Sequence, residues 1–254
     1  MKIKASAKIN LALDVLKKDP SGYHVIQTVY HEIKDLYDKI EIVTSKKKDV
    51  LPNFIPLKVK TATGIQQSED MIVKALNLLR QTFKIKKFVK IKVVKKIPFA
   101  SGLGGGSSDA AAVLKGLNKL WKLKLSKKQL ANLGAKLGMD VPFFIYGGTA
   151  IGKHYGEKIT PLPEIKNIQF KIYLPKTKPA KRKTEEAYGK LNLRDCGKNL
   201  SKTKSLLKGI TTKNTKLTLE NLHNDFETML KKPLLKGRHF SGSGPTTFTA
   251  RVAS

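Results

Sequence analysis

The chain has 254 residues, of which 40% are hydrophobic and 27% are charged, and this balance is typical of a globular protein with two modest domains or one large one. Cys196 is the only cysteine, which excludes an intrachain disulfide and a cysteine metal cluster. No apolar run approaches the roughly 18 residues of a membrane-spanning helix, and the N-terminal sequence lacks the continuous apolar segment of a signal peptide. We therefore expect a cytoplasmic protein.

The charge balance is strongly basic, with 50 Lys+Arg residues against 19 Asp+Glu residues and a formal net charge of +31. Such an excess attracts nucleic acids, anionic lipids and phosphorylated metabolites alike. The lysines occur in short clusters along the whole chain, which is more typical of a solvated surface than of a track for a polyanion. The charge alone does not select among these partners.

The N-terminal part of the chain is predicted to form strands followed by one helix. Apolar residues alternate over residues 2–16 and 23–33, and the segment Asp19-Pro-Ser-Gly22 supplies a turn between them, so we predict a β-hairpin. Similar patterns predict further elements, namely a strand at 39–44, a pair of strands within 51–63, a helix around 72–79 and a strand at 88–94.

A glycine-rich segment follows, and beyond it the pattern becomes mainly helical. We predict a helix after Asp109 that reaches about Trp121, and a capping box at Ser126 to Gln129 predicts a second helix that ends near Gly138. The remaining predictions are a strand at 169–174, helices at 184–191 and 217–231, and a surface connector at 192–216.

The glycine-rich segment, Gly102-Leu-Gly-Gly-Gly-Ser-Ser108, lies between a predicted strand and a predicted helix. Glycines let the backbone approach a ligand closely, and the N-terminus of a helix presents unpaired N–H groups and a positive dipole end to an anion. The segment has neither the Lys-Ser/Thr of a Walker A loop nor the spacing of a Rossmann fingerprint. We predict a phosphate-binding loop; the alternative is a flexible linker, which needs neither a strand before it nor a helix after it.

Three motifs in this order resemble those of the GHMP small-molecule kinases. They are Ala5 to Leu11, Pro98 to Ala111 and Phe240 to Phe248. Within that superfamily the chain is most similar to the kinases that act on 4-diphosphocytidyl-2-C-methyl-D-erythritol. The segments that carry this closer similarity are Ala7 to Leu11, Ser21 to Thr28, the triple glycine at 104–106, and Leu137 to Phe144.

The resemblance implies an α+β fold of two subdomains with the active site in the cleft between them. The expected ATP-binding domain covers residues 1–155, and the expected C-terminal domain covers residues 156–254 and is short at its end. The implied reaction is phosphorylation of the acceptor's 2-hydroxyl by ATP with Mg²⁺, a step of non-mevalonate isoprenoid biosynthesis. The implied partner is a small molecule, with no specific nucleic acid and no membrane; the oligomeric state is not predicted.

The resemblance also assigns roles to individual residues. Asp140 is similar to the general base that accepts the proton of the attacking hydroxyl, and Lys8 to a partner that keeps this carboxylate ionised. Met71 stands where the family commonly has Asn, so we expect one polar contact to the nucleotide to be missing. The implied ATP-binding residues are Lys95, Pro98, Ala100, Ser101, Gly102, Leu103, Gly104, Gly105, Gly106, Ser107 and Ser108.

A further set of residues is similar to those that bind the acceptor. Tyr23, His24 and Tyr188 are placed like residues that stack on the cytosine base and hydrogen-bond its edge. Asn10 is placed to face the methylerythritol hydroxyls. The implied substrate-binding set is completed by Thr184, Gly242, Gly244 and Asp140.

Two alternatives to this function stay open at the level of sequence. The first is another GHMP kinase, acting on homoserine or a mevalonate derivative, which would not need the Tyr23, His24 and Tyr188 arrangement. The second is an RNA-binding protein, which the basic charge would suit and which would show steeply salt-dependent binding without any need for Asp140.

Overall fold

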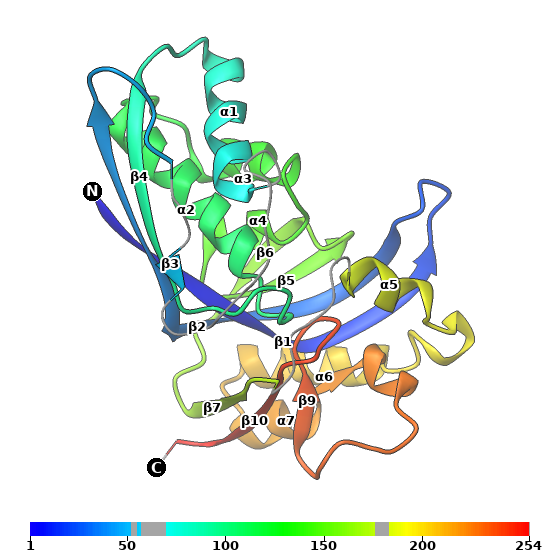
Figure 1. Cartoon of the computed structure of the whole chain (residues 1–254). Coiled ribbons are helices and arrows are strands. Elements are labelled where there is room, and N and C mark those ends of the chain that lie inside the picture. The colour runs from blue at the N-terminus through cyan, green and yellow to red at the C-terminus, as the bar shows by residue number, and fades with distance from the viewer. Residues whose placement is uncertain (52–54, 57–69, 176–182, 254) are drawn as a thin grey trace. The chain divides into compact units, whose positions relative to one another are not determined.

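The computed structural model describes residues 1–51, 55–56, 70–175 and 183–253, and Figure 1 labels its helices and strands. The chain divides into two compact units. The units alternate along the chain. Unit 1 consists of Met1–Ala7, Lys34–Phe99 and Gly104–Tyr146, and unit 2 consists of Lys8–Ile33, Ala100–Leu103 and Gly147–Ser254. Each unit is built from several separate segments of the chain, so the units do not test the expected division into residues 1–155 and 156–254. That domain boundary stays a prediction.

Two long strands, β1 (Lys2–Lys18) and β2 (His24–Ser45), form the predicted hairpin and contribute residues to both units. At the turn, the backbone N–H of Gly22 donates to the carbonyl of Asp19 at 2.9 Å, and Gly22 adopts a φ of +89°, which glycine tolerates best. The prediction of a separate strand at 39–44 was wrong, because these residues continue β2 without a break.

Unit 1 places four helices beside a short sheet. β4 (Phe88–Lys95) pairs antiparallel with the second half of β2 and parallel with β3 (Ile55–Pro56). The exposure of β4 alternates strictly, as predicted, with Val89, Ile91 and Val93 buried. The helices gather on one side of β4 in Figure 1 and are α1 (Met71–Phe83), α2 (Gly105–Leu120), α3 (Lys127–Ala135) and α4 (Val141–Tyr146).

Local sequence explains where two of these helices begin. Asp70 caps α1 by accepting a hydrogen bond from the backbone N–H of Ile72 at 2.8 Å. The predicted capping box of α3 is present, with Gln129 N–H donating to Ser126 Oγ and Ser126 N–H donating to Gln129 Oε1. α2 forms the centre of the helical layer and packs against α1, α3 and α4.

Unit 2 contains the other described strands. β5 (Thr149–His154) pairs antiparallel with Ile26–His31 of β2 and with β6 (Lys158–Leu162), while β8 (His223–Asn224) pairs parallel with β1. A separate three-stranded sheet has the order β7-β10-β9. Its strands are β7 (Ile168–Tyr173), which confirms the strand predicted at 169–174, β9 (Arg238–Phe240) and β10 (Thr247–Val252).

Two predictions in unit 2 were wrong. The supposed connector at 192–216 contains a 3₁₀ turn, η2 (Leu193–Asp195), and the helix α6 (Leu200–Thr211). α6 buries Thr203, Leu206 and Ile210, which lie three or four residues apart and so share one face of the helix despite the lysines between them.

The supposed helix at 217–231 is instead a succession of short elements. These are the end of α7 (Thr215–Glu220), then β8 and the 3₁₀ turn η3 (Asp225–Met229). The reason lies at Asn224, whose side chain accepts a hydrogen bond from the N–H of Phe226 at 3.0 Å and begins the new turn. The helix predicted at 184–191 is confirmed as α5 (Lys183–Gly189).

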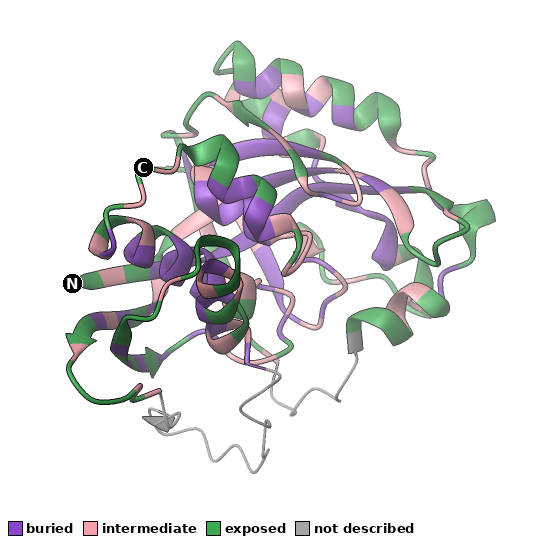
Figure 2. Cartoon of the chain, turned by 90° about the horizontal axis from the view of Figure 1, so that it is seen from above, coloured by how far each residue is buried: buried purple, intermediate pink, exposed green. Residues whose placement is uncertain are grey.

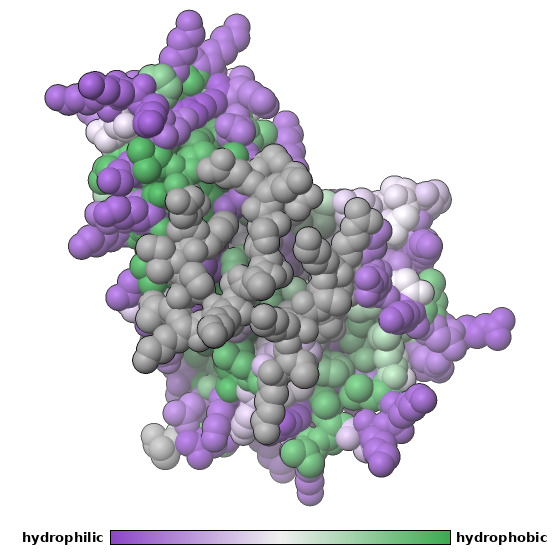
Figure 3. All heavy atoms as spheres, viewed as in Figure 1, coloured by the Kyte–Doolittle hydropathy of each residue, from purple (hydrophilic) through white to green (hydrophobic). Residues whose placement is uncertain are grey.

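Burial follows the strands and the inner faces of the helices, as the purple segments of Figure 2 show. Hydrophilic side chains project over much of the face drawn in Figure 3. No helix among the described residues is long and apolar enough to cross a membrane. Most of the strand pair predicted within 51–63 lies outside the described residues, and of it only Leu51 and β3 are described.

Candidate active site

The helix after the glycine-rich loop begins inside the glycine run rather than after Asp109. Gly104 is its N-cap, with a φ of +71°, and the first helical residue is Gly105. A Cβ atom on Gly105 would lie only 2.9 Å from Cγ2 of Ile97, so the close packing of this turn requires glycine. No side chain of the described residues caps the helix, which leaves its first N–H groups for a ligand.

The middle of the loop, Ala100–Leu103, belongs to unit 2 and meets the third sequence motif there. Ser241 Oγ donates to the carbonyl of Gly102 at 2.9 Å, and the N–H of Thr246 donates to the carbonyl of Ser101 at 3.3 Å. Gly102 has a φ of +83°, and a Cβ atom there would collide with the carbonyl oxygen of Ser241. The second and third motifs, far apart in sequence, are therefore in direct contact.

The first motif joins the same place through Lys8 and Asn10. The backbone N–H of Lys8 donates to the carbonyl of Leu103 at 3.0 Å. Lys8 Nζ donates to Asn10 Oδ1 at 2.7 Å, the N–H of Gly242 donates to the same oxygen at 2.8 Å, and Asn10 Nδ2 donates to Thr28 Oγ1 at 2.8 Å. Lys8 is only 3% exposed. Asn10 thus orients a buried ammonium group against the third motif.

Asp140 belongs to unit 1 and is the half-buried residue immediately before α4. The turn that presents it is closed by the N–H of Val141, which donates to the carbonyl of Gly138 at 3.1 Å. Val141, Phe143 and Phe144 bury the helix behind it. Asp140 is therefore a polar residue held at the N-terminal end of an apolar helix. Lys8 belongs to unit 2, and the pairing of Asp140 with Lys8 stays a prediction.

The aromatic residues assigned to the base lie in unit 2. The rings of His24 and Tyr188 stack with centroids 4.9 Å apart and planes inclined by 29°, and Tyr188 also meets Phe226 edge to face. Burial and the nearby Lys18 lower the pKa of His24, so its ring is neutral at pH 7. The structure therefore brings together the predicted pair His24 and Tyr188, from β2 and α5.

Three other predicted acceptor residues have different surroundings. Tyr23 is half exposed and packs against Tyr155, at 5.1 Å between centroids, a contact that the sequence did not suggest. Thr184 is exposed in the first turn of α5. Gly244 closes the turn of the third motif, since its N–H donates to the carbonyl of Ser241 at 3.0 Å.

Lys95, assigned to ATP, has two buried partners that sequence reasoning missed. Its Nζ donates to Asp38 Oδ2 at 2.5 Å and to Asp109 Oδ2 at 2.6 Å. All three side chains are almost completely buried. The alternation of β4 could have revealed them, because it places Lys95 on the buried face of the strand. A buried ammonium group needs a carboxylate partner.

No cluster of three His, Cys, Asp or Glu side chains that could hold a metal ion occurs in the part of the chain that the structure describes. Lys8, in the first motif, and Lys95, three residues before the second motif, are both buried. Unit 1 thus offers a helix N-terminus suited to an anion and an aspartate at the start of α4, and unit 2 offers the buried ammonium group of Lys8.

Comparison with known proteins agrees with this geometry. The GHMP kinases N terminal domain family matches residues 70–148. The 4-diphosphocytidyl-2-C-methyl-D-erythritol kinase of Clostridium tetani is 40% identical over 98% of this chain and 90% of that protein. The enzyme of the same name from Alkaliphilus metalliredigens is 36% identical over 98% of this chain and 87% of that protein.

A solved structure agrees as well. The crystal structure of a 4-(cytidine 5'-diphospho)-2C-methyl-D-erythritol kinase superposes with a TM-score of 0.73 and 26% identity, covering 98% of this chain and 89% of that one. The α+β fold implied by the three motifs is confirmed. The chain belongs to the 4-diphosphocytidyl-2-C-methyl-D-erythritol kinases, a branch of the GHMP kinases.

Proposed function

We propose that the chain transfers the γ-phosphoryl group of ATP to the 2-hydroxyl of 4-diphosphocytidyl-2-C-methyl-D-erythritol, giving the 2-phosphate and ADP. The observation that carries this proposal is the junction of the three motifs at Lys8, Asn10, Gly102 and Gly242. A flexible Gly/Ser linker would not be held by such buried contacts. Relatives of this name align along nearly the whole chain, which favours this acceptor over homoserine, a mevalonate derivative or RNA.

In this proposal the N-terminus of α2 binds the phosphates of ATP. The N–H groups of its first turn and the positive end of its dipole would face the phosphate oxygens, and the ammonium group of Lys95, paired with Asp38 and Asp109, lies beside this turn. The rest of the assigned loop, from Pro98 to Ser108, would follow the triphosphate with its backbone. Mg²⁺, when bound with ATP, would reduce the repulsion among the phosphate oxygens, and because the described residues hold no cluster of metal-binding side chains, the nucleotide itself would supply most of its ligands.

Asp140 and Lys8 would carry the chemistry. Asp140 accepts the proton of the attacking hydroxyl, and the ammonium of Lys8, oriented by Asn10, stabilises the charge that develops on the transferred group. The acceptor's base would be recognised by His24, Tyr188 and Tyr23, and its hydroxyls by Asn10. In the described structure His24 and Tyr188 stack on each other, so a base bound between them would have to separate the rings.

The decisive variant is Asp140→Ala, assayed by release of ADP with the cytidine diphosphate acceptor and excess Mg-ATP. We expect turnover to fall by about 100-fold or more, the usual contribution of a general base. The matched control is Asp35→Ala, which removes an exposed carboxylate of β2 and should leave turnover unchanged. Wild-type turnover by the folded Asp140→Ala protein would contradict the assigned role.

The expected cytoplasmic location suits an enzyme that consumes ATP and stays a prediction, as does the Mg²⁺ requirement. The latter is tested by chelation with EDTA, which should abolish ADP release, and by restoring activity with MgCl₂. Release of ADP that continues after chelation would contradict the requirement.

A further inference from the structure

A buried cation with two buried anions lies at the start of the helix assigned to ATP. Lys95, at the end of β4, contacts Asp38 of β2 and Asp109 of α2, and the exposures of the three residues are 7%, 0% and 3% respectively. We call these residues the lysine cluster. All three belong to unit 1, so one ammonium group links two strands of the sheet to the helix beside them.

The lysine cluster holds the backbone on both sides of the loop. Asp38 Oδ1 accepts hydrogen bonds from the N–H of Lys96 at 2.5 Å and from the N–H of Ile97 at 2.9 Å, just before the loop begins. On the other side, a Cβ atom on Gly105, the first residue of α2, would lie 3.6 Å from Nζ of Lys95. The ammonium group therefore sits against the helix end that carries the unpaired N–H groups.

Charge explains why this lysine has two carboxylates. The N-terminus of α2 is the positive end of its dipole, and an ammonium group beside it is unfavourable unless anions compensate. Burial by itself would lower the pKa of Lys95, yet the charges of Asp109 and Asp38 raise it, so the lysine stays charged. With both carboxylates ionised, the lysine cluster carries a net charge of −1, which opposes binding of a triphosphate.

Asp109 is the member of the lysine cluster that can change its charge near neutral pH. Its Oδ1 is buried and has no hydrogen-bond partner among the described residues. Burial raises the pKa of Asp109 to about 7; the charge of Lys95 acts against this, while Asp38 adds to it. Asp70, the N-cap of α1, also faces Lys95 and has a pKa raised by burial.

We propose that Asp109 is a positioning residue for ATP: together with Asp38 it fixes the Lys95 ammonium beside the first turn of α2, and its protonation sets the net charge of the lysine cluster. This inference rests on the proposed function, since it takes the N-terminus of α2 to be the phosphate site. Neutral Asp109 leaves the lysine cluster uncharged overall, and ionised Asp109 makes it negative. ATP therefore binds more weakly above the pH at which Asp109 ionises.

The test is the dissociation constant of the magnesium complex of a non-hydrolysable ATP analogue, measured by calorimetry for wild type and Asp109→Asn. The ratio of the wild-type dissociation constant to that of the variant should increase about three- to tenfold from about pH 6 to about pH 8.5. An increase of this size is expected when one partly screened negative charge appears near the nucleotide. Taking the ratio of the two proteins cancels the ionisation of the nucleotide itself. In turnover assays the same change should appear in the KM for ATP, with kcat and the KM for the acceptor little altered.

Asp38→Asn is a second variant that does not depend on the folding of Asp109→Asn. It removes the like charge that raises the pKa of Asp109, so the pH dependence of nucleotide binding should move to lower pH. The matched control is Asp49→Asn, which replaces a carboxylate of unit 1 that is paired with Arg80 at 2.5 Å. This control should keep the wild-type pH dependence of nucleotide binding.

Each outcome bears on one claim. A wild-type dissociation constant with the same pH dependence as that of Asp109→Asn, or an Asp38→Asn profile that does not move, would overturn the inference even if the enzyme phosphorylates its acceptor normally. Turnover on a different acceptor would change the proposed function and leave the binding result intact. A protein that binds no ATP analogue at either pH would overturn both.

Discussion

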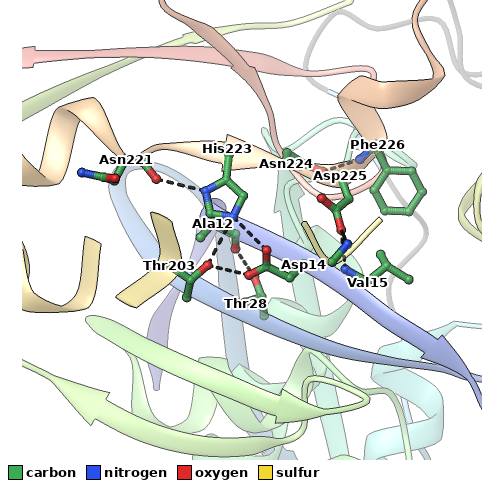
Figure 4. Close-up of polar contacts among 11 residues, drawn as sticks. Ala12, Asp14, Val15, Thr28, Thr203, Asn221, His223, Asn224, Asp225 and Phe226 are labelled. Atoms are coloured by element: carbon green, nitrogen blue, oxygen red, sulfur yellow. Dashed lines mark hydrogen bonds and ion pairs between the residues drawn. The ribbon is translucent and has the colours of Figure 1, made fainter. Parts of the chain in front are cut away.

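Each unit contains a buried cluster in which a cationic side chain is paired with carboxylates, and the two clusters differ in the number of carboxylates. In the lysine cluster of unit 1, one cation faces two carboxylates. In unit 2, the residues Asp14, Thr203 and His223, which we call the histidine cluster, pair one cation with one carboxylate (Figure 4). The difference lies in the charge that is left over.

The histidine cluster is balanced because each ring nitrogen of His223 faces an oxygen that can accept its proton, and the Thr203 hydroxyl, 3.2 Å from Nε2, already donates to Asp14. Nδ1 lies 3.0 Å from the carbonyl oxygen of Asn221, and Nε2 lies 3.0 Å from Asp14 Oδ1. Both nitrogens therefore donate, and the ring is an imidazolium. Burial by itself would lower the pKa of His223, but the hydrogen bonds to Asp14 and Asn221 raise it.

The comparison teaches that the number of carboxylates for each cation decides which group of a buried cluster sets its response to pH: the cation in a matched pair, and the extra carboxylate where there are two. The histidine cluster joins β8 to β1 and α6 through a protonated ring that matches the charge of Asp14, while the nearby Asp225 accepts from the N–H groups of Val15 and Gly197. The lysine cluster has an excess carboxylate that takes up a proton near pH 7, and it lies at the helix assigned to ATP. Three substitutions separate these two behaviours.

The largest effect is expected for Lys95→Met, which leaves two carboxylates buried without their cation. We expect the free energy of unfolding to fall by about 3–5 kcal/mol, the usual cost of breaking a buried ion pair from one side. Urea unfolding measures the change. Lys96→Met, which removes an exposed lysine one residue away, is the control; equal stability of the two variants would show that the lysine cluster contributes nothing to folding.

A smaller loss is expected for His223→Gln, roughly 2–3 kcal/mol at low pH, because the amide can still donate one hydrogen bond to Asp14. The sign of its pH dependence follows from the raised pKa of His223. The stability from the protonated ring is fully present below pH 6.5, the ordinary pKa, and is lost as the pH rises through the higher folded value.

The deficit of His223→Gln should therefore be greatest below pH 6.5 and shrink in more alkaline solution, which thermal unfolding across this range measures. His239→Gln is the matched control, since this half-buried ring lies 3.3 Å from Glu227 outside the histidine cluster. A deficit that grew with rising pH would mean that His223 is neutral in the folded protein.

The smallest effect is expected for Thr203→Val. Thr203 Oγ1 donates to Asp14 Oδ2 at 2.5 Å, and valine keeps the shape of the side chain while removing this donor. We expect a loss of about 1–2 kcal/mol in unfolding free energy, because the carboxylate keeps its bond to His223. Thr211→Val, at an exposed position of α6, should cost much less; equal losses would indicate that helix propensity rather than the hydrogen bond is responsible.

Much of the fold follows from local patterns in the sequence. Alternation predicted β4, helical periodicity predicted α1, and the capping box at Ser126 predicted where α3 begins. The resemblance assigned Lys8, Asn10 and Gly242 to one site, and the structure brings the three residues into contact, while their roles stay predictions.

What sequence reasoning missed depends on contacts between distant residues. α6 was taken for a connector because its lysines mask the buried stripe, which becomes apparent only where Thr203 meets Asp14. The start of α2 at Gly105 depends on the packing of that glycine against Ile97, which overrides its weak helix propensity. Asp38 lies 57 residues before Lys95, so no local pattern links them.

The central claim of the proposed function is that this chain acts on a cytidine diphosphate acceptor. The most direct test is ADP release by the wild-type protein with excess Mg-ATP, comparing 4-diphosphocytidyl-2-C-methyl-D-erythritol with homoserine and mevalonate. We predict release with the cytidine compound alone. Release with homoserine or mevalonate instead, or with none of the three, would contradict the claim.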